Sequence, residues 1–236
     1  MTAPRVALVD TGVNPTHPHV AGVAGGVAIA GGAGQPLTFG DGWLDRLGHG
    51  TAVAGAVRLL APDAQLLAVS VFDPDGRAPW DRLVAAIDWA IAEGCALCNL
   101  SVGTPDPAAA EALAAAVARA TAAGMLVVAA APLAGPPTWP AAAPGALGVR
   151  ADMDLAPHAV GYVAGDPAPW RALGAPRALA GPNQRRNFKG GSFAAARVTG
   201  LLADAWTAAG VQDAARLRAW LADYAGVGDG SWRAPR

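Results

Sequence analysis

Short apolar runs alternate with longer helical segments along most of the chain, and this alternation constrains the fold more than any other feature. Runs typical of buried strands occupy 5–9, 65–72, 95–102, 125–131 and 145–149. Helical patterns cover 80–93, 108–123, 192–209 and 214–224, and a further helix starts at Gly48 and is stopped by Pro62. Such an order builds a mostly parallel sheet with helices on both faces. The sequence therefore predicts an α/β fold.

The chain is expected to form a single domain over residues 1–236. It is 53% hydrophobic, which excludes a disordered protein. No internal repeat is present, and no linker is long enough to divide the chain. The glycine-rich region 21–42 is expected to form loops and short strands.

Charge and apolar patterning exclude several classes of partner. Lys and Arg total 17 against 18 for Asp and Glu, so no net positive field exists to attract a nucleic acid. No stretch of about 18 residues is apolar enough to span a membrane. We read the frequent arginines as a result of base composition.

The N-terminal region and the cysteines favour a cytoplasmic protein. Arg5 and Asp10 interrupt the N-terminal region, which therefore does not resemble a signal peptide. Cys95 and Cys98 are too few for a disulfide framework, which favours a reducing compartment.

Three short motifs combine into a chemical pattern: VDTG around Asp10, GHGTAVAG around His49 and GGSFAAARVTG around Ser192. Each alone has a structural explanation, as a turn cap, a glycine-rich segment or a helix N-cap. Together, one follows a strand and two open helices, so a parallel sheet would bring all three to one edge. A serine at a helix N-terminus lies where backbone N–H groups stabilise negative charge. This arrangement indicates acyl transfer.

The three motifs, and the order Asp, His, Ser in which they occur, resemble those of the subtilisin-like serine proteases, or subtilases. In that family the catalytic residues follow one another along the chain in this order. Further matches are APDAQLLAVSVFDPDG, the Asn99, Ser101 and Gly103 spacing, and WPAAAPGALGV at 139–149. The resemblance covers residues 5–206 approximately.

This resemblance implies roles for individual residues. Ser192 is expected to be the nucleophile, His49 the general base and then acid, and Asp10 the residue that orients the imidazole. Ser101, Val102 and Gly103 match the strand that pairs with an extended peptide substrate. The missing side chain of Gly103 is expected to leave room for the peptide backbone.

One departure affects the oxyanion hole. The family segment AAAGN, whose Asn donates to the oxyanion, aligns with AAAPL, so Pro132 and Leu133 replace Gly and Asn. Loss of this donor in a subtilisin reduces kcat by about 10² to 10³. We expect weakened catalysis, with Asn187 as the preferred replacement donor. Asn183, Gln184 and a second backbone N–H beside that of Ser192 are the alternatives.

Other departures concern packing and regulation. Arg197 stands where the family has His, which is expected to affect helix packing more than chemistry. The first strand begins close to Met1, so no inhibitory propeptide is expected. The basic residues Arg185, Arg186 and Lys189 either meet acidic residues of a substrate or form a solvated loop.

No cofactor is expected, and no metal site. Asp41 and Asp45, and likewise Asp73 and Asp75, offer too few oxygen ligands for calcium and are interpreted as solvated turn carboxylates.

The resemblance implies a serine endopeptidase whose substrate is a peptide or protein. A weak oxyanion hole favours selective cleavage of one partner, such as a leader-bearing precursor of a modified peptide or protein. The alternatives are a pseudoprotease that only binds peptides, and an esterase or amidase that acts on a small molecule. The intact trio Asp10, His49 and Ser192 argues against the pseudoprotease.

Overall fold

The computed structural model describes residues 2–179 and 185–227, and these residues form a nine-stranded sheet. The strand order is β3-β2-β4-β1-β5-β6-β7-β9-β8, and every pair is parallel except β2–β3 and β8–β9. The strands are β1 (Arg5–Asp10), β2 (Gly25–Gly32), β3 (Gln35–Gly40), β4 (Gln65–Ser70), β5 (Leu97–Leu100), β6 (Leu126–Ala130), β7 (Leu147–Ala151), β8 (Val160–Tyr162) and β9 (Trp170–Ala172).

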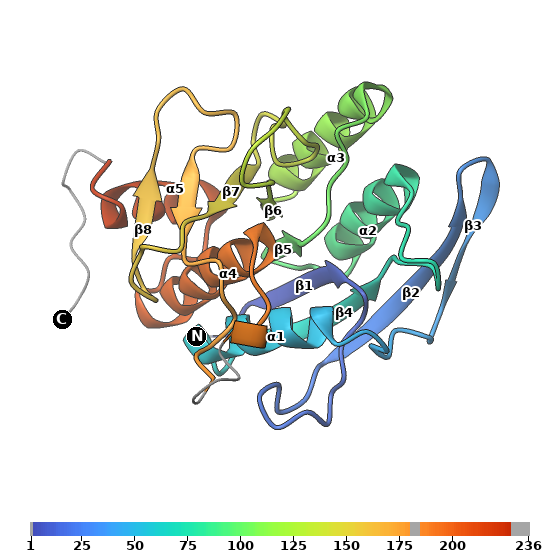
Figure 1. Cartoon of the computed structure of the whole chain (residues 1–236), viewed down its shortest axis with the longest axis horizontal. Helices are drawn as coiled ribbons and strands as arrows, with labels where there is room; N and C mark the ends of the chain where they lie inside the picture. The colour runs from blue at the N-terminus through green and yellow to red at the C-terminus, as the bar shows by residue number, and fades with distance from the viewer. Residues whose placement is uncertain (1, 180–184, 228–236) are drawn as a thin grey trace.

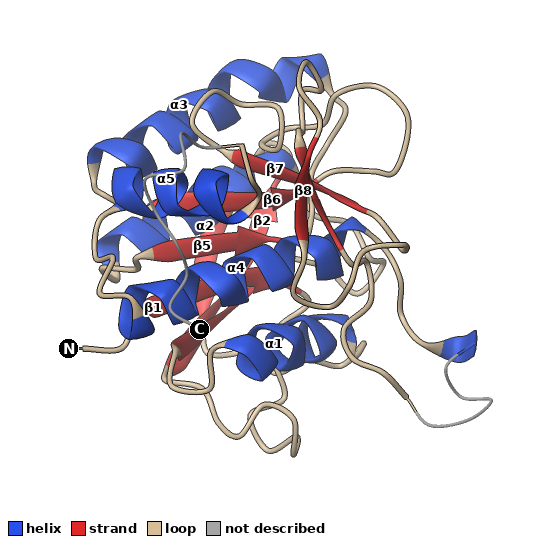
Figure 2. Cartoon of the chain, turned by 90° about the vertical axis from the view of Figure 1, so that its left-hand side faces the viewer, coloured by secondary structure: helices blue, strands red, loops and turns tan. Residues whose placement is uncertain are grey.

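Helices cover both faces of this sheet, as the sequence predicts (Figures 1 and 2). They are α1 (His49–Leu60), α2 (Trp80–Ala92), α3 (Ala110–Ala122), α4 (Gly191–Ala208) and α5 (Ala214–Tyr224). One core packs α1, α4 and α5 against the sheet, and the other packs α2 and α3. Strand β1 serves both cores because its side chains alternate: Val6 and Leu8 enter one, Ala7 and Val9 the other.

The chain reverses its direction across the sheet at the pair β1 and β5. After β1 it forms β2, β3 and β4 on one side, and it then crosses to β5, β6 and β7 on the other side. In open α/β sheets, ligands bind beyond the carboxyl ends of the strands at such a reversal. Asp10 ends β1 and Ser101 follows β5, so both lie at this position.

The structure differs from the expected elements in two regions. The strand expected over 95–102 is limited to Leu97–Leu100, because the chain leaves the sheet after Ser101, whose N–H still donates to the Val9 carbonyl at 3.2 Å. Two three-residue strands, β8 and β9, were not expected, since a run of three residues is too short to show a period.

A search for membrane-spanning segments over residues 2–179 and 185–227 finds no helix with the length and apolar character to cross a bilayer.

Six arginines anchor loops by donating to backbone carbonyl oxygens, which gives them a structural role that their frequency did not suggest. They are Arg58, Arg82, Arg150, Arg171, Arg197 and Arg218. Arg197 is only 3% exposed within α4. Its guanidinium donates to the carbonyls of Pro157, Ala175 and Pro176 at 2.8, 2.9 and 3.2 Å. This departure from the family His therefore acts on packing, as expected.

Replacement of Arg197 by Met should lower the free energy of unfolding by about 3 kcal/mol, because buried carbonyl groups lose their donors. Urea denaturation followed by circular dichroism measures this change. Arg216 is exposed on α5, so Arg216→Met is the matched control and should shift stability by less than about 0.5 kcal/mol. Equal effects of the two substitutions would contradict the anchoring role.

Candidate active site

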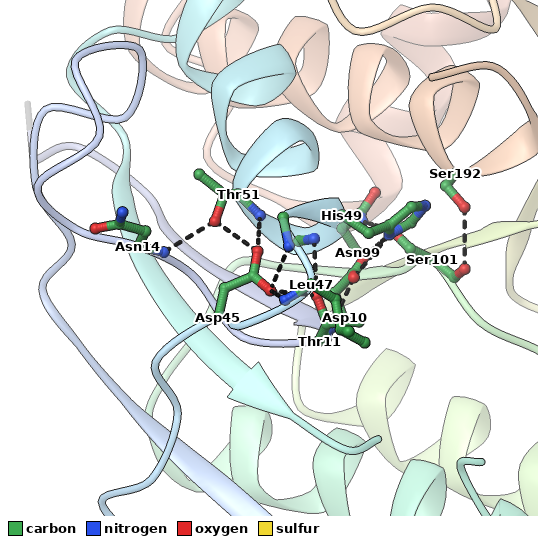
Figure 3. A network of polar contacts seen from close by, with 12 residues as sticks. Asp10, Thr11, Asn14, Asp45, Leu47, His49, Thr51, Asn99, Ser101 and Ser192 are labelled. Atoms are coloured by element: carbon green, nitrogen blue, oxygen red, sulfur yellow. Dashed lines mark hydrogen bonds and ion pairs between the residues drawn. The ribbon is translucent and has the colours of Figure 1, made fainter. Parts of the chain in front are cut away.

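Asp10 and His49 form the best-defined pair at the carboxyl edge of the sheet. Asp10 is fully buried at the end of β1, and His49 is the first residue of α1. The His49 Nδ1 lies 2.8 Å from Asp10 Oδ1 and 3.0 Å from Oδ2 (Figure 3). Asp10 Oδ1 also accepts from the Thr11 N–H at 2.7 Å. These contacts fix Nδ1 as the protonated nitrogen and leave Nε2 as the proton acceptor.

A close backbone approach brings α1 to the end of β1. A Cβ atom at position 50 would lie 2.1 Å from the Gly12 carbonyl oxygen and 3.1 Å from the Asp10 Cβ. Only glycine fits at this contact, which explains the glycine that follows His49 in the motif. The motif therefore encodes the distance between Asp10 and His49.

Asp45 joins the two motifs, and the sequence analysis misread it as a solvated turn carboxylate. Its Oδ1 accepts from Thr11 Oγ1 and from the N–H groups of Leu47 and Gly48, each at 2.9 Å (Figure 3). Its Oδ2 accepts from the Thr51 N–H at 2.9 Å and from Thr51 Oγ1 at 2.5 Å. Asp45 thus caps the start of α1 from outside the helix. The signal in the sequence was an Asp four residues before the His.

The charges around His49 raise its pKa. Burial alone would lower the pKa, but the hydrogen bond to Asp10 and the negative charges of Asp10 and Asp45 outweigh it. Burial alone would raise the pKa of Asp45, yet the hydrogen bonds from Thr51, Gly48 and Leu47 lower it, so Asp45 stays ionised. The raised pKa makes the neutral imidazole of His49 a stronger base than an isolated histidine.

Ser192 lies at the start of α4, close to the residues that surround His49. The imidazole of His49 packs against the ring of Phe193, the next residue, with 5.2 Å between ring centroids. Within the described residues, Ser192 and His49 share no hydrogen bond, and Ser192 Oγ instead donates to the Ser101 carbonyl oxygen at 3.1 Å (Figure 3). Catalytic hydrogen bonds are often unformed without a substrate.

The N-terminus of α4 presses directly on the end of β6. A Cβ atom at position 191 would lie 2.3 Å from the Ala131 carbonyl oxygen, so only glycine fits before Ser192. The first N–H groups of a helix have no intrahelical partner, and they carry its positive dipole end. Developing negative charge beside Ser192 is stabilised there.

Ser101, Val102 and Gly103 form an extended segment that follows β5. A Cβ at position 103 would lie 2.9 Å from the Trp139 carbonyl oxygen, so this close approach also favours glycine, and the role of Gly103 toward a substrate stays a prediction. Thr104 and Trp139 pair through two backbone hydrogen bonds of 2.9 and 2.8 Å. A cavity of about 260 Å³ lies between these segments and Ser192, with walls of Ser101, Gly103, Ala130, Ala131, Pro132, Thr138, Gly191 and Ser192.

Asn187 is the preferred candidate for the donor that replaces the family Asn in the oxyanion hole. Leu133 is 76% exposed and has no polar group to offer. The Asn187 Nδ2 donates to the Arg177 carbonyl oxygen at 2.6 Å, which uses one of its two N–H bonds. Asn183 and Gln184 lie outside the described residues. The role of Asn187 therefore stays a prediction.

No group of three or more His, Cys, Asp or Glu side chains that could hold a metal ion is present in the described part of the chain. The chemistry available at this edge of the sheet is that of a hydroxyl, an imidazole and a buried carboxylate.

Comparison with known proteins relates the chain to one sequence family. The sequence model of the subtilase family matches residues 2–233. Subtilisin BL of Lederbergia lenta is 39% identical over 135 residues, which are 53% of this chain and 46% of that protein. Subtilisin E of Bacillus subtilis is 32% identical over 136 residues, which are 54% of this chain and 33% of that protein. The chain thus spans less than half the length of these curated relatives.

Two solved structures share the fold. Sphericase superposes with a TM-score of 0.71 at 25% identity, over 93% of this chain and 82% of that one. A structure described as a lanthipeptide protease gives a TM-score of 0.69 at 20% identity, over 91% of this chain and 77% of that one.

Replacement of Asp10 by Asn should lower the pKa of His49, because the hydrogen bond to a carboxylate and its negative charge are both lost. NMR titration of the imidazole C–H signals measures the shift. Asp88→Asn is the control, since Asp88 pairs with Arg119 on an exposed surface. A pKa in Asp10→Asn equal to or above the native value would contradict the assignment.

The same pair makes stability depend on pH. Because the folded pKa of His49 exceeds its unfolded value, the pair stabilises the fold fully below about pH 6.5. This contribution to the free energy of unfolding is lost as the pH rises through the folded pKa of His49. The Asp10→Asn variant should therefore show no such decrease in stability over the same pH range.

Proposed function

The chain belongs to the subtilase family, and from that premise we propose that it is a serine endopeptidase acting through an acyl-enzyme. The observation that supports this most directly is the Asp10–His49 hydrogen bond, formed beside the helix N-terminus that carries Ser192.

In the proposed reaction, Ser192 Oγ attacks the carbonyl carbon of the scissile bond, and its proton passes to His49 Nε2. Asp10 holds Nδ1 and stabilises the imidazolium. His49 then gives the proton to the leaving amine, the C–N bond breaks, and an ester to Ser192 remains. Water, deprotonated by His49, hydrolyses this ester and releases Ser192.

Without substrate, the Ser192 hydroxyl donates to the Ser101 carbonyl oxygen, and a bound substrate can release it from this hydrogen bond. An extended peptide that pairs with Ser101, Val102 and Gly103 donates a backbone N–H to the same carbonyl. This competition favours rotation of the Ser192 hydroxyl toward His49. Substrate binding is thereby coupled to formation of the catalytic hydrogen bond.

We further propose that the substrate is a leader-bearing precursor. The exposed Leu133 at the family Asn position favours a slow, selective enzyme over a digestive one. The likeness in fold to a lanthipeptide protease is consistent with such a role. A specific form of this proposal is maturation of the quinohemoprotein amine dehydrogenase small subunit. The buried free thiols of Cys95 and Cys98 fit a reducing compartment such as the cytoplasm.

A fluorophosphonate probe should label the native protein at Ser192, and the Ser192→Ala variant should lose both labelling and peptide hydrolysis. Intact-mass spectrometry measures the labelling. Ser70→Ala, which removes another serine hydroxyl, is the control and should still be labelled. A native protein that binds peptides yet stays unlabelled is the outcome expected of a pseudoprotease, and it contradicts this proposal.

The oxyanion role of Asn187 is tested by Asn187→Ala. If Asn187 donates to the oxyanion, the single-turnover acylation rate should fall by about 10² with little change in substrate affinity. Stopped-flow measurement with an ester substrate gives this rate. An unchanged rate would exclude Asn187 and leave Asn183, Gln184 or a second backbone N–H as the donor.

A further inference from the structure

A second cavity, of about 470 Å³, lies at the start of α1, next to His49. Its described walls come from residues within 14–19, 45–55, 176–179 and 187–188. It shares no lining residue with the cavity beside Ser101 and Gly103. Phe188 forms one wall and also packs edge-on against His49, with 5.7 Å between ring centroids. This cavity, which we call the α1 pocket, is therefore adjacent to the reacting centre.

Two unpaired guanidinium groups line the α1 pocket. Arg46 and Arg177 both belong to its walls. Within the described residues, neither has an ion-pair or hydrogen-bonded partner for its guanidinium. The carboxylate that also lines the pocket, Asp45, already accepts five hydrogen bonds from the motifs around His49. Two guanidinium charges against the one carboxylate charge of Asp45 leave the pocket with a net positive charge.

Two histidines, His17 and His19, line the same pocket, and the positive charge of Arg177 acts on the pKa of His19. His17 and His19 lie 5.1 Å apart, measured between ring centroids, in an edge-to-face arrangement. The pKa of His19 is lowered by burial and then by the positive charges of Arg177 and His17. Arg177 is thus close enough to His19 for their charges to interact.

The segment that carries Arg177 is held in place from both sides. Arg197 of α4 donates to the carbonyls of Ala175 and Pro176, and Asn187 donates to the carbonyl of Arg177 itself. A guanidinium on an anchored backbone loses less conformational freedom on binding than one on a free loop. Leu47 and Phe188 add apolar wall to the pocket and reduce the competition from water.

We propose that the α1 pocket binds an Asp or Glu side chain on the leaving-group side of the substrate. The inference rests on the proposed peptidase function. The acyl part of the peptide lies along Ser101, Val102 and Gly103, and His49 protonates the departing amine. The chain beyond the scissile bond therefore continues past His49, toward the α1 pocket. Guanidinium groups bind carboxylates through paired, charge-assisted hydrogen bonds.

The test compares peptides that differ only in Glu or Gln at each of the four positions after the scissile bond. The parent peptide is one that the enzyme cleaves, identified by mass spectrometry of a digested peptide library. At one of these positions the native enzyme should prefer Glu by about tenfold in kcat/KM. The Arg46→Gln, Arg177→Gln double variant should reduce this ratio to less than about twofold.

The matched control is Arg216→Gln, which removes an exposed arginine on α5 and should keep the native Glu/Gln ratio. Because each ratio is measured within one enzyme, a general loss of activity in the double variant does not affect it. A ratio near one at all four positions, or a preference that survives the double substitution, would overturn the inference.

Failure of the proposed function gives a different result. If neither the library nor the probe shows hydrolysis or labelling, the peptidase proposal fails. Peptides of one fixed sequence, with either Glu or Gln at a single position, are then tested for binding to Ser192→Ala by fluorescence anisotropy. If the Glu peptide binds more tightly than the Gln peptide, and this difference is lost when Arg46 and Arg177 are both replaced by Gln, the result supports the α1 pocket independently. Equal binding of the two peptides overturns the inference.

Discussion

The carboxylate of Asp45 holds the end of β1 against the start of α1, and the geometry of the site depends on this connection. Its two oxygens accept hydrogen bonds from Thr11 on one side and from Gly48 and Thr51 on the other. Asp10 and His49 stand directly beside these anchored residues. A side chain that contacts neither Ser192 nor the proposed substrate strand thus sets the position of the imidazole and adds to the charge that raises its pKa.

Much of the fold could be predicted from the sequence, because the central strands and the main helices show clear apolar patterns and the functional motifs occur where these elements meet. Asp10 ends a strand, and His49 and Ser192 open helices, so parallel topology alone brings them to one edge. Asp45 was misread because its partners are backbone groups and hydroxyls, which leave no pattern in a single sequence. For Gly103 the sequence indicated only a role toward a substrate, and it could not show that the neighbouring backbone of Trp139 also leaves no room for a side chain there.

The structural role of the arginines also could not be predicted from the sequence. Their number reflects composition, but the structure gives many of them backbone carbonyls that no strand or helix satisfies. Arg197 and Arg150 are both nearly buried, and each connects a regular element to a loop that borders the site. A buried carbonyl without a donor is costly, so a guanidinium with several N–H groups stabilises irregular segments efficiently. Composition cannot reveal which arginines serve this purpose.

Under the proposed function, the two cavities make a weak oxyanion hole compatible with selective cleavage. Catalysis depends on interactions gained in the transition state, and binding energy from remote parts of a substrate can align the reacting groups. In this chain, Ser192 Oγ donates a hydrogen bond to the Ser101 carbonyl oxygen. In the proposed mode of binding, the same oxygen accepts a hydrogen bond from the substrate backbone. A substrate that engages that carbonyl on one side of His49 and Arg46 and Arg177 on the other is positioned across the imidazole from both directions. Selectivity then comes from the length of peptide recognised, while a short or neutral peptide gains little of this alignment.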